Sequence, residues 1–72
     1  MDDVDVLKLH SKYANAIKKY KFLTSWCETS TGHMAIVIDS NDNAVMIEGP
    51  NIDVTVKLAQ LQMLARYQEV VL

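Results

Sequence analysis

Hydrophobic residues recur at every third or fourth position over the first twenty residues of the chain. The recurring positions are Val6, Leu9, Tyr13, Ala16, Ile17 and Tyr20. At about 100° per residue these side chains fall on one face of a helix. Aspartates precede this stripe and lysines follow it, which is the order that the helix dipole favours. The pattern predicts a helix over residues 3–20.

The composition changes after residue 21. Residues 22–29, Phe-Leu-Thr-Ser-Trp-Cys-Glu-Thr, are rich in aromatic, β-branched and small hydroxyl side chains, which favour a strand over a helix. We therefore predict a strand over about residues 22–28. The alternative is that the first helix continues to Trp26 and that a loop follows it.

Two apolar runs bordered by turn sequences come next. Ser30–Gly32 and Ser40–Asn43 are the turn sequences, and they border predicted strands at residues 33–39 and 44–48. Both alternating sets of side chains in this hairpin are apolar, a pattern typical of strands that are covered on both faces. Helices can cover one face, so we expect the other face to need a partner.

A Gly-Pro pair ends the last strand, and Asn51 or Asp53 can cap a final helix from Val54 to about Val70. The resulting order is α-β-β-β-α, or α-β-β-α if the first predicted strand is absent. Either order predicts an α+β fold, a small antiparallel meander of two or three strands flanked by N- and C-terminal helices. No linker or repeat divides the chain, so we expect a single domain over residues 1–72.

The final helix has two apolar stripes instead of one. Val54, Leu58, Leu61, Leu64, Ala65 and Leu72 form the first, and Val56, Ala59, Met63, Tyr67 and Val70 lie nearly opposite. We interpret the second stripe as an oligomer interface, in a homodimer or higher assembly. The alternative is that the helix lies in a groove between the sheet and the first helix, with both stripes buried inside one subunit.

Composition favours the oligomer interpretation. The chain has 72 residues, half of them hydrophobic, and a single cysteine, so it cannot form an internal disulfide, and no Cys/His cluster offers a zinc site. Small domains without such staples often associate. No signal peptide and no run of about 18 apolar residues is present. We therefore expect a soluble, cytoplasmic protein.

Charge is distributed unevenly along the chain. Residues 1–21 carry five lysines and three aspartates, whereas the remainder carries two basic and six acidic residues. Lys8, Lys12 and Lys19 share one side of the first helix, and with His33 they form a candidate site for an anionic partner. The alternative is an ordinary solvated helix face. A net charge of −2 and a single arginine weaken a nucleic-acid function.

The predicted order resembles that of double-stranded-RNA-binding domains. Gly32 and His33, placed before a strand, are similar to the glycine and histidine of that family's loop between its first two strands. The resemblance implies RNA binding, mainly through backbone contacts. The family opens its last helix with clustered lysines that contact phosphates, whereas this chain supplies only Lys57 there.

Motifs for catalysis and metal binding are weak. Residues 39–43 place Asp and Asn at alternate positions, as in a calcium loop, but the required glycine and the final glutamate are replaced by Ala44 and Pro50. Cys27 with His10 or His33 lacks the surroundings of a cysteine enzyme. We expect no enzyme activity, no metal and no cofactor.

Trp26 is a candidate hot spot for a partner or a small ligand, although a partly buried strand residue explains it as well. We expect a binding or regulatory protein of adaptor or inhibitor type, such as a phage-type accessory protein, that acts as a homo-oligomer on a second protein. The second hypothesis is a nucleic-acid or nucleotide-binding module that uses the helix lysines and His33.

Overall fold

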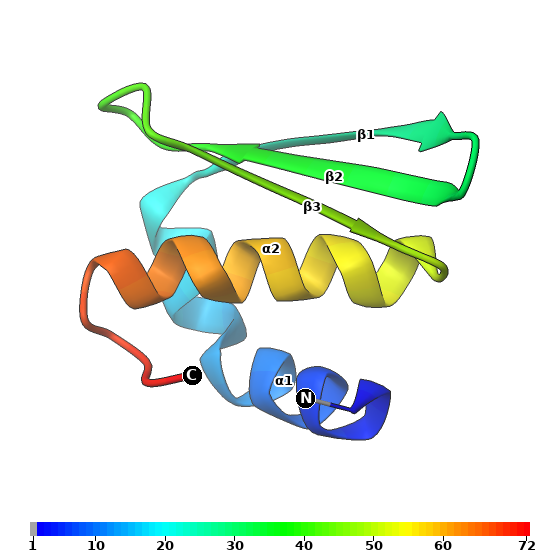
Figure 1. The fold of residues 1–72 in the computed structure, drawn as a ribbon. Coiled ribbons are helices and arrows are strands. Elements are labelled where there is room, and N and C mark those ends of the chain that lie inside the picture. Colours follow the sequence, from blue (N-terminus) through cyan, green and yellow to red (C-terminus); the bar gives the residue numbers. More distant parts are fainter. Residues whose placement is uncertain (1) are drawn as a thin grey trace.

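The computed structural model describes residues 2–72 and contains two helices and one sheet (Figure 1). The elements are α1 (Asp3–Tyr20), β1 (Leu23–Thr29), β2 (Gly32–Ile38), β3 (Ala44–Gly49) and α2 (Ile52–Arg66). The predicted order α-β-β-β-α and the α+β class are confirmed. The alternative in which the first helix continues to Trp26 is wrong, because the chain from Leu23 onward pairs with β2.

Local side-chain interactions set the helix ends. The Asp2 carboxylate accepts a hydrogen bond from the Asp5 N–H at 3.0 Å, and the Asn51 side chain accepts one from the Val54 N–H at 3.2 Å. Capping by Asn51 starts α2 two residues earlier than the predicted Val54.

The predicted end of the second helix near Val70 is wrong. The chain leaves α2 after Arg66, and Gln68 adopts a positive φ of 61°. This turn reverses the last residues, so that Val70 folds back into the protein and is only 5% exposed.

The three strands form an antiparallel meander in the order β1-β2-β3. Ala35 in the central strand lies opposite Trp26 on one side and Ile47 on the other. A Cβ atom at Gly49 would overlap the Thr55 hydroxyl, so glycine at this position lets the end of β3 approach the first turn of α2.

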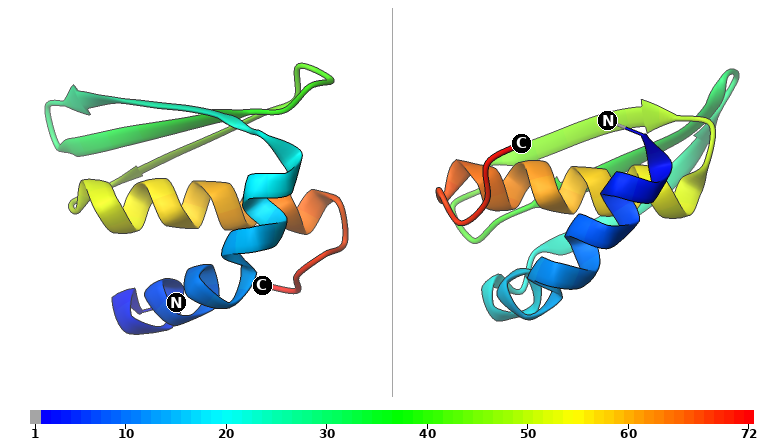
Figure 2. Two further views of the ribbon diagram at one scale, coloured as in Figure 1. Left: turned by 180° about the vertical axis from the view of Figure 1, so that it is seen from behind. Right: turned by 90° about the horizontal axis from the view of Figure 1, so that it is seen from below.

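The molecule has three layers with α2 in the middle. The sheet lies on one side of α2 and α1 lies on the other (Figures 1 and 2). Among these elements α1 packs on α2 and not on the sheet, whereas α2 packs mainly on β2 and β3. Helix α2 therefore covers little of strand β1.

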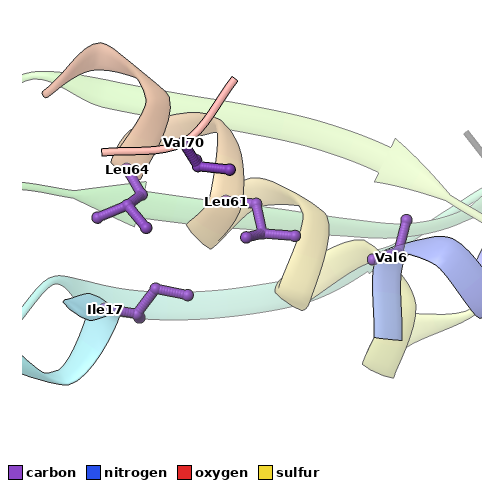
Figure 3. Close-up of a cluster of buried hydrophobic side chains, with 5 residues drawn as sticks. All are labelled: Val6, Ile17, Leu61, Leu64 and Val70. Atoms are coloured by element: carbon purple, nitrogen blue, oxygen red, sulfur yellow. The ribbon is translucent and has the colours of Figure 1, made fainter. Parts of the chain in front are cut away.

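Each side of α2 has its own hydrophobic core. Toward α1 the buried residues are Val6, Ile17, Leu61, Leu64 and Val70 (Figure 3), and toward the sheet they are Ala35, Val37, Val45, Ala59 and Met63. These two cores correspond to the two apolar stripes of the final helix.

The structure corrects the assignment of the second stripe to an oligomer interface. Ala59 and Met63 are fully buried against the sheet, Val56 and Tyr67 are half-buried in the same cluster, and Val70 lies in the other core. The groove alternative describes the arrangement, because a helix placed between two layers must be apolar on both sides. Self-association through another surface stays a prediction.

Candidate functional site

The sheet face that points away from α2 is apolar and uncovered. Since Ala35, Val37 and Val45 are buried on the α2 side, the alternate residues of each strand point outward. We define the outer face as Leu23, Ser25, Cys27, Met34, Ile36, Ile38, Ala44, Met46 and Glu48. Leu23 and Met46 are 71% and 65% exposed, respectively.

The outer face is nearly free of charge. Its one ionisable carboxylate, Glu48, lies near the end of β3 and accepts a hydrogen bond of 3.0 Å from the Thr31 hydroxyl. Hydrogen bonds from the side chains of Thr29 and Thr31 lower the pKa of Glu48 below its ordinary value. The centre of the face, at Ile36 and its neighbours, is left apolar. Three strands about 4.8 Å apart and about 23 Å long give roughly 300 Å² of flat surface, the size of patches that often mark binding sites.

Strand β1 is exposed on both of its faces. Trp26 points to the α2 side of the sheet, yet it is 61% exposed, because α2 lies over the other two strands. Its indole borders a pocket of about 250 Å³ that is also lined by Ile52, Asp53 and Val56. The candidate hot spot Trp26 is therefore accessible to a partner.

The candidate anionic-partner residues do not converge. Lys8 and Lys12 line a hollow of about 390 Å³ on α1, but Asp5 and Leu9 line it too. His33 lies on β2, opposite Gly49 and Glu28, away from the helix that carries the lysines.

Two of the lysines have aromatic neighbours. The Nζ atoms of Lys12 and Lys19 are each 5.6 Å from the ring centroid of the tyrosine that follows in sequence. His33 is half-buried, and its Nδ1 has no hydrogen-bond partner within residues 2–72. The lysines thus form an exposed helix face, and His33 is a separate feature.

The turn between β2 and β3 is closed by Asp39, a residue that is only 6% exposed. Its carboxylate accepts hydrogen bonds from the Tyr67 hydroxyl at 2.5 Å and from the backbone N–H groups of Asn41 and Asn43 at 2.9 and 2.8 Å. The Tyr67 hydrogen bond is the main reason that the pKa of Asp39 falls to about 2. The acidic turn that resembled a calcium loop is thus held by internal donors.

Aromatic rings join the end of α1 to the C-terminal segment. Tyr20 stacks on Phe22 and Tyr67 with centroid separations of 5.5 and 4.7 Å. The Tyr20 hydroxyl donates to Glu69 at 2.7 Å, and this hydrogen bond raises the pKa of Tyr20. These contacts explain why the end of the chain is held against the protein, a feature that no motif in the sequence signals.

The candidate cysteine–histidine pairs are not assembled. Cys27 is exposed on the outer face, whereas His33 points to the opposite side of the sheet. His10 forms a 2.7 Å hydrogen bond with Gln60 of α2. In the part of the chain that the structure describes, no three metal-ligating side chains are grouped, and no helix has the length and hydrophobicity needed to cross a membrane.

Comparison of the chain with protein-family profiles, with curated proteins and with solved structures gave no match. The resemblance to double-stranded-RNA-binding domains is thus limited to element order and two residues. The outer face and the open strand β1 are the surfaces from which a function can be argued.

Proposed function

We propose that this protein is a non-catalytic binding module that engages another protein through the outer face of its sheet. The observation that carries the proposal is the combination of exposed Leu23 and Met46 with half-buried Met34, Ile36 and Ile38 on one surface whose only charged residue, Glu48, lies at its margin. An apolar sheet face of this kind is normally covered. Exposure of this face to water is unfavourable, and its burial against a second apolar surface is favourable.

The dimensions favour an amphipathic helix of the partner protein as the occupant. Three strands span about 14 Å, and a helix with its side chains is about 10–12 Å across. The same sheet already accommodates a helix on its inner side, where Ala59 and Met63 of α2 pack on Ala35 and Val37. The outer face offers a matching width and similar side chains to a second helix.

Charge argues against a phosphate-bearing partner at this face. The outer face has no lysine or arginine, and Glu48 adds a negative charge at its margin. Helix α1, which carries most of the lysines, lies on the side of α2 opposite the sheet (Figure 1). Binding through the outer face should therefore be insensitive to salt, whereas phosphate binding weakens steeply as salt rises.

A photo-crosslinking amino acid at Met46 tests this proposal. In extract of the native cell we expect a discrete crosslink to one protein, and Ile36→Lys in the same chain should abolish it by placing a charge at the centre of the face. The matched control carries the crosslinker at Val4, an α1 residue that is 58% exposed, and should not label that protein.

Thermal unfolding must first show that Ile36→Lys is folded. Equal labelling from Met46 and Val4, or labelling that survives Ile36→Lys in the folded protein, would rule out the outer face as the binding surface. Persistence of the Met46 crosslink in about 1 M salt would separate apolar docking from attraction between charges.

A further inference from the structure

Strand β1 is the least protected part of the fold. Its outer edge pairs with no other strand within residues 2–72, and five of its seven residues are exposed, including Leu23 and Trp26. A free edge presents unpaired N–H and C=O groups that can pair with another chain. Both side-chain faces and the backbone edge of β1 are therefore open.

The usual devices that block edge pairing are missing from β1. Charged side chains, especially lysine, together with proline and bulges protect free edges in many proteins, yet β1 has Glu28 as its one charged residue, contains no lysine or proline and pairs with β2 in an unbroken register. The other edge strand, β3, is better protected at one end, since Pro50 directly follows its last residue, Gly49.

We propose that β1 pairs antiparallel with β1 of a second copy of this chain, which joins two three-stranded sheets into one continuous six-stranded sheet. Symmetry selects the register. In the dimer, a twofold axis normal to the sheet relates the two β1 strands. Residues opposite each other lie on the same face of the sheet only if this axis passes between the same residue of the two copies, which is then the centre of the pairing. Centring on Trp26 pairs all seven residues of β1, and any other centre leaves residues unpaired.

The side chains in this register are compatible. On the α2 side, Trp26 faces the Trp26 of the second copy, where aromatic pairing adds to the buried area. Glu28, the one charged residue of β1, faces Thr24 of the second copy and not another Glu28. No like charges are therefore placed opposite each other.

The area predicts a reversible dimer. An edge about 23 Å long on a sheet about 10 Å thick buries roughly 500 Å² in total, well below the roughly 1,200 Å² of standard stable interfaces. We therefore expect association that depends on protein concentration. Pairing would double the outer face into one apolar surface, but it does not require the partner in the proposed function.

Sedimentation equilibrium with two matched variants tests the dimer. The mass of the unmodified protein should rise from 8.1 kDa toward twice that value as the concentration increases. Trp26→Lys, which places two like charges opposite each other, should remain at 8.1 kDa. Met46→Lys changes a residue of similar exposure, 65% against 61%, on the opposite edge strand, and should still dimerise.

A mass of 8.1 kDa at every concentration up to about 1 mM would overturn the proposal, since no dimer of useful affinity would exist. Loss of the dimer in Met46→Lys but not in Trp26→Lys would overturn it too, because it would assign self-association to the outer face. Ile36→Lys, the variant that tests partner binding, should dimerise normally, so the two proposals can fail separately.

Disulfide trapping tests the register. Ser25→Cys places a second thiol opposite Cys27 of the other copy, at a Cα separation of about 4.5–5.5 Å that a disulfide can span. Oxidation should then give a covalent dimer. The control Ser25→Cys with Cys27→Ser leaves only diagonal pairs about 7–8 Å apart and should crosslink poorly. Equal crosslinking of the two variants would exclude the register centred on Trp26.

Discussion

Asp39 connects two parts of the chain that are distant in sequence. Its carboxylate closes the β2–β3 turn through the N–H groups of Asn41 and Asn43, and it also accepts the hydroxyl hydrogen bond of Tyr67 just after α2. The ionised carboxylate accepts these three hydrogen bonds and a fourth of 3.0 Å from the Asn43 side-chain amide, which is why its pKa is low. The Asp-Asn turn predicted from the sequence thus also makes a tertiary contact with the segment that follows α2.

The low pKa makes a pH-dependent contribution to stability. The pKa of Asp39 falls from 3.8 to about 2 in the folded protein, so its stabilising effect is complete above 3.8 and is lost as the pH falls toward 2. Asp39→Asn should therefore lower the unfolding temperature at about pH 7, and its difference from the unmodified protein should shrink as the pH falls below about 4.

Thermal unfolding followed by circular dichroism over this pH range measures the effect. Asp42→Asn is the matched control, because Asp42 lies in the same turn, is exposed and has a φ of 63° that asparagine tolerates. An Asp39→Asn deficit that stays constant down to pH 2 would contradict the assignment of the low pKa to this carboxylate.

Helix α2 is the element on which both hydrophobic cores depend. Leu61 and Leu64 pack toward α1, and Ala59 and Met63 pack toward the sheet, all with no exposed surface. A substitution on either side of α2 should therefore destabilise the subunit itself.

Met63→Ala distinguishes a core position from an interface position. Truncating this fully buried side chain should lower the free energy of unfolding by about 2–5 kcal/mol. Val71→Ala, at a residue that is 93% exposed, should change it by less than about 0.5 kcal/mol. Urea unfolding at low protein concentration makes the comparison. Unchanged stability of Met63→Ala under these conditions would indicate that Met63 lies in an interface between subunits and not in the core.

Local patterns in the sequence predicted the elements and their order, although they left open whether the first strand was present. The 3.6-residue stripe of α1, the strand-favouring composition of β1 and the apolar runs of β2 and β3 between turn sequences are local patterns, and local patterns determine element type. The helix ends were less predictable, since capping by Asn51 and the turn at Gln68 depend on single residues.

The stacking order of the layers could not be predicted from the same patterns. Two apolar stripes on one helix fit a subunit interface and a buried middle layer equally well, because periodicity shows which faces avoid water and not what covers them. The hairpin of β2 and β3 posed the same ambiguity, and there one face is open in the subunit. The exposure of Trp26 depends on where α2 lies across the sheet, which is a tertiary property.

The three-layer arrangement distributes stability unevenly over the whole molecule. The middle layer is protected on both sides, and the central strand β2 is paired on both edges. Strand β1 has one free edge and little helix cover. Regions with few buried contacts open most readily, so β1 should be the first strand to exchange its amide protons.

Amide hydrogen exchange measured at two protein concentrations tests both this uneven stability and the proposed pairing of β1. At low concentration the slowest amides should lie in α2 around Leu61 and Met63, followed by those of β2, with those of β1 exchanging fastest among the strands. At high concentration protection should increase only at alternate residues of β1, because alternate N–H groups of an antiparallel strand point to opposite edges. A general slowing of all β1 amides would indicate stabilisation of the whole strand and not a new backbone pairing at its free edge.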